Sequence, residues 1–180
     1  GLNISSVRFE NETLRTSMKY IGKPKYGYNA GISADFYLSD ALLLQTDFLY
    51  STKGFAYQQT YSKGNKQFNY GITSIAGKVF FNPENEVVFS VFMSPFFGYW
   101  ISGERTDLDF RTGNIRVDEI YLNSDTTFNY NRYDGGIIGG VELRFSQPYN
   151  RFFHIGAKYE QGMFSTDVEN VDGWRNRTFS

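Results

Sequence analysis

Residues 28–38 read Tyr-Asn-Ala-Gly-Ile-Ser-Ala-Asp-Phe-Tyr-Leu, and their side chains alternate between two chemical types. The even positions, from Tyr28 to Leu38, carry aromatic, aliphatic or alanine side chains, whereas the odd positions are mostly asparagine, glycine, serine or aspartate. A period of two residues is typical of a β-strand whose faces meet different environments. This segment therefore predicts a strand with one apolar face and one polar face.

The same alternation, clear or weakened, returns along the rest of the chain. Strands are expected at residues 2–5, 28–38, 41–53, 68–81, 87–102, 133–145, 153–160 and 175–180. Residues 87–102 are nearly apolar on both faces, which leaves the orientation of that strand open. The pattern predicts eight strands, the first and last of them short.

The links between these strands differ in length. Short links are expected at residues 39–40, 82–86 and 147–150, and long polar links at about 7–25, 56–67, 103–132 and 165–174. Because alternate links of an up-and-down meander emerge at the same end, the short ones share one rim and the long ones the other. This asymmetry is typical of outer-membrane barrels. We expect one all-β domain over residues 1–180, an eight-stranded antiparallel up-and-down transmembrane β-barrel.

The composition excludes several classes of protein. Aromatic residues make up 19% of the chain, which favours β-structure, and no apolar run approaches the roughly 18 residues of a membrane helix. The chain has no cysteine and one histidine, His154, so neither thiolate chemistry nor a histidine-rich metal centre is expected. A formal net charge of -1 gives no field that would attract nucleic acid.

The polar face of the predicted strands indicates what the barrel contains. Eight strands leave an interior just wide enough for side chains to fill it. A structural charge network is expected to line this lumen, made of Asp35, Gln45, Asp47, Lys53, Glu142, Arg144, Lys158 and Glu160. Buried charges must be paired, so Glu142, Arg144, Lys158 and Glu160 are expected to contact opposite charges across the lumen. A soluble lipocalin-like barrel, the alternative, would place its apolar face inside.

Aromatic residues gather near both ends of the predicted strands. Those near the short links are Tyr37, Phe80, Phe81, Phe145, Tyr149, Phe152 and Phe153, and those towards the long links are Tyr26, Tyr28, Tyr50, Tyr99, Trp100 and Tyr133. Rings with an apolar body and a polar tip favour the membrane–water interface. These residues predict two aromatic girdles.

Several segments resemble the PorT-like outer-membrane β-barrel family of Bacteroidota. They are Gly-Leu-Asn-Ile-Ser-Ser at 1–6, GISADF at 31–36, LQTDFLYSTKG at 44–54, YDGGIIGGVELRF at 133–145, AKYEQG at 157–162 and NRTFS at 176–180. The chain departs from the family where Ser74 replaces an expected proline, and its first and last strands are short. The resemblance implies an outer-membrane location and no enzymatic activity, and the namesake of the family takes part in type IX secretion.

Three motifs suggest other chemistry and are each weighed against a structural role. Residues 135–140, Gly-Gly-Ile-Ile-Gly-Gly, contain the glycines of a phosphate loop but continue as a strand rather than a helix, which favours close packing inside the barrel. His154 would be a catalytic base, yet no serine partner is evident. The acidic residues of the 103–132 loop lack calcium-loop spacing, because Arg111 occupies a ligand position.

The favoured function is that of a non-enzymatic barrel that serves as a structural or accessory subunit, without cofactor or metal. Its longest loop is expected to bind a partner through Asp107, Phe110, Tyr121, Phe128 and Tyr130. Expected partners are outer-membrane lipids or lipopolysaccharide and other outer-membrane or periplasmic subunits of a secretion or assembly complex. A narrow transport pore, an enzyme at the lumen or rim, and the soluble barrel remain as alternatives.

Overall fold

The computed structural model describes residues 1–9, 23–58, 62–120, 132–147, 151–163 and 174–180. The strands are β1 (Leu2–Phe9), β2 (Lys23–Ser39), β3 (Leu42–Gln58), β4 (Ser62–Phe81), β5 (Val87–Asp109), β6 (Ile115–Ile120), β7 (Tyr133–Gln147), β8 (Arg151–Gly162) and β9 (Trp174–Phe179). Among these residues no helix is long and apolar enough to cross a membrane.

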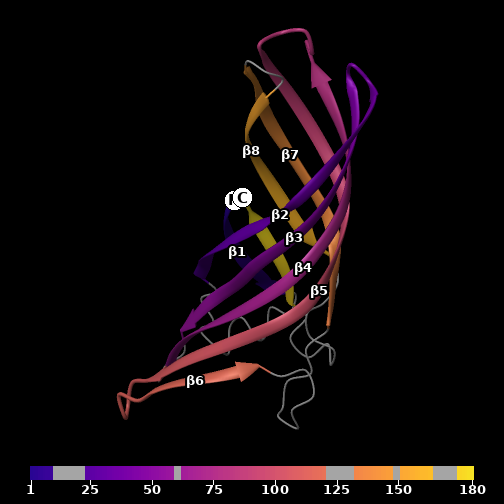
Figure 1. The fold of residues 1–180 in the computed structure, drawn as a ribbon. Helices are drawn as coiled ribbons and strands as arrows, with labels where there is room; N and C mark the ends of the chain where they lie inside the picture. Colours follow the sequence, from indigo (N-terminus) through magenta and orange to yellow (C-terminus); the bar gives the residue numbers. More distant parts are fainter. Residues whose placement is uncertain (10–22, 59–61, 121–131, 148–150, 164–173) are drawn as a thin grey trace.

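The strands form one antiparallel sheet that closes into a ring (Figure 1). Its order is β4-β3-β2-β1-β9-β8-β7-β5, and β5 pairs back with β4. The additional strand β6 pairs with the outer end of β5, from Leu108 opposite Ile115 to Gly103 opposite Ile120. The predicted all-β antiparallel barrel is therefore confirmed, with eight strands in the ring and a ninth, β6, attached to it.

The predicted long links are strand over part of their length, and in the link at 7–25 residues 7–9 belong to β1 and residues 23–25 to β2. The prediction of a link at 56–67 is wrong, because β3 and β4 stay paired from Leu42 opposite Val79 to Gln58 opposite Lys63. The predicted loop 103–132 likewise holds the end of β5 and the whole of β6. The reason is packing: Phe55, Tyr57 and Phe68 are buried together in this outer half, which keeps the strands extended beyond the predicted rim.

The two faces of the wall have opposite character. Large apolar side chains on the outer face are exposed, among them Ile32, Phe48, Met93, Ile137 and Ile155. The inner face instead carries buried charged side chains, among them Lys53, Lys78, Asp134, Arg144 and Glu160. They lie among two buried apolar clusters, one of Phe55, Tyr57, Phe68, Tyr70, Ile72, Phe96, Trp100 and Ile138 and the other of Leu43, Phe80 and Val88. An exposed apolar outer face with charges buried inside differs from the lipocalin-like alternative, whose polar face would be outside, and suits a barrel whose outer face meets lipid.

The open question of how β5 is oriented is settled by burial. Phe89, Met93 and Phe97 are exposed on the outer face, whereas Ser90, Ser94 and Phe96 are buried inside. Four aromatic residues assigned to the girdles lie on the inner face: Tyr37 and Phe152 contact the buried Arg144, and Trp100 and Phe80 are themselves buried. Trp100 is 2% exposed and Phe80 is 4% exposed, because each alternates with an outward neighbour, Tyr99 and Phe81 respectively.

The wall is paired unevenly between β2 and β8. There β1 pairs with β2 from Tyr28 back to Lys25, and β9 pairs with β8 only from Tyr159 to Gln161. In the part of the chain that the structure describes, no strand pairs on this side with residues 30–39 of β2 or 151–157 of β8. The predicted lumen residue Asp35 lies on this stretch of β2, and its side chain is therefore exposed rather than enclosed.

Candidate functional site: a charged lumen and an outer extension

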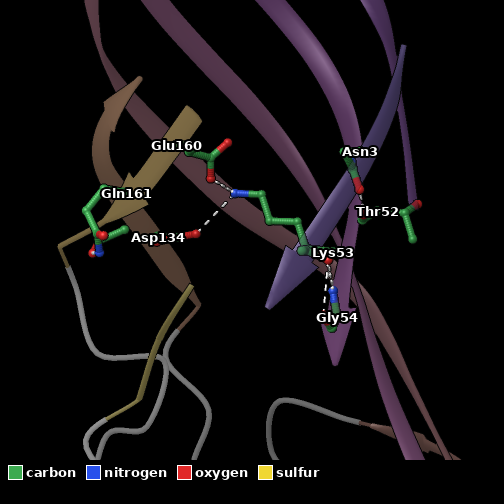
Figure 2. A network of polar contacts seen from close by, with 9 residues as sticks. Asn3, Thr52, Lys53, Gly54, Asp134, Glu160 and Gln161 are labelled. Atoms are coloured by element: carbon green, nitrogen blue, oxygen red, sulfur yellow. Dashed lines mark hydrogen bonds and ion pairs between the residues drawn. The ribbon is translucent and has the colours of Figure 1, made fainter. Parts of the chain in front are cut away.

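Lys53 is the centre of a buried ion cluster in the lumen. Its ammonium group, carried by β3, pairs with Glu160 of β8 and lies 3.3 Å from Asp134 Oδ2 of β7. Figure 2 shows the side chain extending across the barrel to these two carboxylates. The three residues are 1%, 5% and 2% exposed, respectively. Because a buried charge is tolerated only when it is paired, this cluster fixes three strands relative to one another.

Aromatic rings enclose the Lys53 ammonium group. It lies 5.2 Å from the centroid of Tyr70 and 5.0 Å from that of Phe96, within the range of a cation–π contact. Trp100 and Phe68 pack edge to face beside them, with ring centroids 6.0 Å apart. Charged and aromatic side chains therefore occupy the barrel interior at this level.

Two glycines of β7 make room for the rings. A Cβ atom added to Gly136 would lie 2.9 Å from Phe96 Cε1, and one added to Gly140 would lie 2.6 Å from Phe92 Cζ. Both positions would also press on the backbone of β8, at Gln161 and Ala157. The glycines of residues 135–140 thus admit bulky neighbours into a narrow barrel, and the segment continues as strand β7.

A second ion cluster lies nearer the short turns. Lys78 of β4 is buried, and its Nζ lies 2.9 Å from Glu142 Oε1 of β7. The same oxygen is 2.8 Å from Nδ1 of His154 on β8. His154 is thus a partner of a carboxylate that already holds a lysine, and the contact joins β4, β7 and β8.

Arg144 departs from the expected ion pair. Its guanidinium lies 4.6 Å from the ring centroid of Phe80 and 5.0 Å from that of Phe152, and its Nη1 donates to the Tyr37 hydroxyl at 3.4 Å. The planar guanidinium stacks on aromatic faces and is more weakly hydrated than an ammonium, which explains why rings enclose it here. Arg144 is 8% exposed.

The remaining predicted lumen residues lie around these clusters. Asp47 accepts hydrogen bonds from Ser33 Oγ at 2.6 Å, Gln45 Nε2 at 2.7 Å and Ser74 Oγ at 3.2 Å. The Lys158 ammonium is half-buried and lies within electrostatic range of Glu160 and Asp47. These contacts extend the Lys53 cluster around the inner wall.

The outer halves of β3, β4 and β5 form an extension that continues beyond the aromatic positions Tyr50 and Tyr99 (Figure 1). At its inner face the Tyr57 hydroxyl donates to the Asp107 carboxylate and accepts from Arg105 Nε at 3.2 Å, while Arg105 pairs with Asp107. Burial raises the pKa of Tyr57, and the hydrogen bond to Asp107 adds to the rise. The hydroxyl therefore stays protonated and keeps its role as a donor.

An irregularity in β5 places Arg105 and Asp107 on this inner face. The register of β5 against β4 shifts between Asn69 and Tyr70, opposite Ser102 and Trp100. The even-numbered Phe96 and Trp100 point inwards before the shift, and the odd-numbered Gly103 is buried after it. A bulge of this kind re-aims every later side chain of the strand.

The predicted partner-binding residues fall in three different settings. Asp107 is held by Tyr57 and Arg105, so it supports the extension rather than standing free. Phe110 is exposed in the turn between β5 and β6. Tyr121, Phe128 and Tyr130 lie outside the described residues. Asp109, one of the acidic residues of the predicted 103–132 loop, accepts a hydrogen bond from the Arg111 amide at 2.8 Å.

Two important members of the ion clusters, Lys78 and Asp134, were not among the residues predicted for the network. Asp134 occupies the polar side of the predicted strand 133–145, so the alternation contained the signal. Lys78 lies in a strand with weaker alternation, where Ile72, Ala76 and Phe80 share its inner face. A single lysine among apolar residues gives no sign of a carboxylate on another strand.

Comparison with known proteins agrees with this architecture. Residues 1–168 match the family model described as "Outer membrane protein beta-barrel domain". Neither the curated proteins nor the solved structures give a match to this chain. The family match covers most of the chain and fits a wall with an apolar outer face and a charged interior. The chain therefore belongs to the outer membrane protein β-barrel domain family, and its location is the bacterial outer membrane.

Proposed function

We propose that this protein is a non-enzymatic barrel that serves as a structural or accessory subunit of an outer-membrane complex, with its outer extension as the recognition surface. The observation that carries the proposal is the contrast between the barrel interior and the outer end of the molecule. The Lys53 cluster fills the interior, whereas β5 and β6 continue outwards as a paired hairpin. A filled barrel with a projecting sheet is suited to binding rather than to passage.

The filled interior argues against the narrow pore. Solute would have to displace Lys53 from Glu160 and Asp134, and Trp100 and Phe68 from their shared cluster. Removing one partner from a buried ion pair costs about 3–5 kcal/mol, because the remaining charge is left without compensation. A lumen of this kind favours a closed barrel.

The surroundings of His154 argue against an enzyme. In the described part of the chain its hydrogen bond goes to Glu142, which also binds Lys78. A general base in a triad needs a nucleophile on the other ring nitrogen, at hydrogen-bond distance. His154 acts instead as a polar link between β7 and β8.

The resemblance to PorT-like proteins of Bacteroidota supports a more specific version of the proposal. It suggests a role in a secretion or assembly complex, with other outer-membrane or periplasmic subunits as partners and lipids or lipopolysaccharide around the barrel. The exposed Phe110 and the projecting hairpin favour a protein partner at the outer end.

The test is affinity capture from native membranes in mild detergent, with wild-type protein and two variants. The first variant lacks residues 110–129, which removes β6 but keeps Asp107 with Tyr57. The control replaces Glu84 and Asn85 with alanine in the opposite, short turn between β4 and β5. We expect a stoichiometric partner with the wild type and the control, lost with the deletion. The same partners with all three proteins, or none with any, would contradict the proposal.

A further inference from the structure

Arg144 of β7 is a buried cation without a carboxylate partner among the described residues. It is 8% exposed. Lys53 and Lys78, which are also buried, each form an ion pair with a carboxylate on another strand. None of the ion pairs in the described part of the chain includes Arg144. Because a buried charge is stable only when an opposite charge compensates it, Arg144 needs an anion.

The carboxylates of Glu142 and Asp47 on the inner face are engaged by other groups. Glu142 binds the buried lysine of β4 and also His154, the residue directly opposite Arg144 on β8. Asp47 accepts three hydrogen bonds from neutral side chains. The sequence that follows β7, Pro-Tyr-Asn at 148–150, contains no acidic residue. These groups leave the charge of Arg144 uncompensated.

The guanidinium of Arg144 has hydrogen-bond donors to spare. Phe80 and Phe152 contact it through their ring faces, at 4.6 Å and 5.0 Å from the ring centroids, and such contacts use none of its five in-plane N–H groups. Nη1 donates to the Tyr37 hydroxyl at 3.4 Å, a long hydrogen bond. Nε is buried, and in the part of the chain that the structure describes it has no acceptor. A buried donor without an acceptor is costly, so this edge of the guanidinium is suited to an incoming oxygen.

Arg144 lies at the short-turn end of the barrel. Two residues further along β7, the Ser146 amide donates to the Glu86 carbonyl in the turn between β4 and β5, at 2.8 Å. Figure 1 shows this turn at the opposite end of the molecule from β6. Tyr37 and Phe152 are 57% and 48% exposed, so they lie at the entrance to the guanidinium. The short turns of an outer-membrane barrel face the periplasm, and a ligand of Arg144 therefore arrives from that side.

The two phenyl rings favour a flat anion. A carboxylate places its two oxygens beside two N–H groups in the plane of the guanidinium, as in bidentate arginine–carboxylate pairs. A phosphate bound through two oxygens directs its other two oxygens out of that plane, towards Phe80 and Phe152. The face of an aromatic ring carries partial negative charge and repels them. This geometry selects a carboxylate over a phosphate.

We propose that Arg144, Tyr37, Phe80 and Phe152 form a binding site for one carboxylate group that arrives from the short-turn end of the barrel. The group belongs to a free organic acid or to a periplasmic protein, since both sources present the same planar anion. The proposal goes beyond the function proposed above, because this site lies at the other end of the barrel from the outer extension and does not depend on it.

The test is a titration of the folded protein in detergent with sodium acetate, at constant pH and ionic strength. The readout is the Hε signal of Arg144 in a proton–nitrogen correlation spectrum, identified by its loss in Arg144→Lys. We expect a saturable shift with acetate and none with chloride, because Nε gains an acceptor. Arg116, which already pairs with Asp118, is the control and should show no saturable shift. No saturable shift of the Arg144 signal with acetate, or an equal one with chloride, would overturn the proposal.

Urea unfolding gives a second measure that does not need the Arg144 signal. A ligand that binds the folded state alone raises the unfolding midpoint, so acetate should raise that of the wild type. In Arg144→Lys, which keeps the charge but has no planar edge, the apparent affinity for acetate should fall about tenfold or more. Methyl phosphate should bind the wild type about tenfold more weakly than acetate does. Equal rises in both proteins, or methyl phosphate binding as tightly as acetate, would contradict a carboxylate site. The wild-type titrations alone decide the matter if Arg144→Lys does not fold.

Asp35→Asn tests whether the counter-charge comes from the barrel itself. Asp35 is exposed on the inner side of β2, two residues before Tyr37. We expect this variant to keep the wild-type Arg144 signal in the absence of acetate, and to bind acetate with the wild-type affinity. A changed signal together with tighter binding of acetate would show that Asp35 pairs with Arg144 in solution, and the proposal would fall.

The source of the carboxylate is distinguished by a comparison of acetate with N-acetylglutamic acid α-amide, which carries a side-chain carboxylate on a peptide unit. Similar affinity for the two supports the site and shows that the entrance admits a carboxylate of a protein. Binding of acetate alone supports the site as one for a free acid. Failure of both overturns the proposal, and it leaves the result of partner capture on the outer extension unchanged.

Discussion

Lys53 of β3 pairs with Glu160 of β8 across the barrel, although the two strands are not neighbours in the sheet. Asp134 of β7 shares the same ammonium group. Each of these residues occupies the polar side of a strand with a clear two-residue alternation. These contacts connect three strands, β3, β7 and β8, that are far apart in the sequence.

Replacing Lys53 with methionine should destabilise the barrel by about 3–5 kcal/mol, because Glu160 and Asp134 would be left buried without their cation. The measurement is urea unfolding in detergent, followed by heat-modified migration. Lys63→Met, at an exposed position of β4, is the matched control and should change the free energy of unfolding by less than about 0.5 kcal/mol.

The neutral triple variant Lys53→Met/Asp134→Asn/Glu160→Gln separates charge from packing. It removes all three charges and keeps similar volumes, so it should recover most of the stability lost in Lys53→Met. Recovery of none of it would mean that the lysine acts through its contacts with Tyr70 and Phe96 instead.

Replacing Gly140 with alanine should cost about 1–3 kcal/mol, because the added Cβ would meet Phe92 Cζ and the Ala157 carbonyl oxygen, each at 2.6 Å. At Gly77 nothing lies within 4 Å of an added Cβ. Gly77→Ala, the control in β4, should be neutral or stabilising by about 0.5–1 kcal/mol. Equal costs for the two substitutions would contradict the tight packing of β7 against β5 and β8.

The Tyr57 hydroxyl gives the outer extension a pH dependence. Its pKa is raised from 10.0, so the folded state holds the proton more tightly than the unfolded state does. Its contribution is complete below pH 10.0 and declines as the pH rises above that value. Tyr57→Phe should lose the hydrogen bonds to Asp107 and Arg105, about 1–3 kcal/mol, and flatten this alkaline decline.

Protease protection of the hairpin, followed from pH 8 to 11, measures that decline. Tyr26→Phe is a suitable control, because Tyr26 is exposed on β2. A wild-type decline that matches that of Tyr57→Phe at every pH would show that Tyr57 does not hold the extension.

The sequence alone predicted the barrel because alternation is a local property of each strand. Tyr28 to Leu38 and Tyr133 to Phe145 each show one apolar and one polar face without reference to any other segment. The polar faces also contain Lys53, Glu142 and Glu160, whose side chains lie on the inner side of the barrel. The sequence of one strand does not show which opposite charge on another strand its side chains will contact. The pairing of Asp134 with Lys53, and of Lys78 with Glu142, was therefore not predicted.

The outer half of the molecule was harder to predict for a different reason. Beyond Tyr50 and Tyr99 both faces of the strands carry polar side chains, so the period of two fades and residues 56–67 read as a loop. The register shift near Trp100 then places the side chains of Arg105 and Asp107 on the inner face. No residue type at 100–102 predicts this shift. The exposure of Asp35 could not be predicted from its own strand either, because it depends on which strands pair with β2.

Single-channel conductance in planar bilayers tests the central claim, a lumen closed by the Lys53 cluster, most directly. The account predicts that purified wild-type protein inserts without conductance steps, and that Lys53→Ala opens measurable ones if its barrel remains folded. Steady ohmic steps from the wild-type protein, unchanged in Lys53→Ala, would mean that the lumen is an open path and that the narrow pore is the better description.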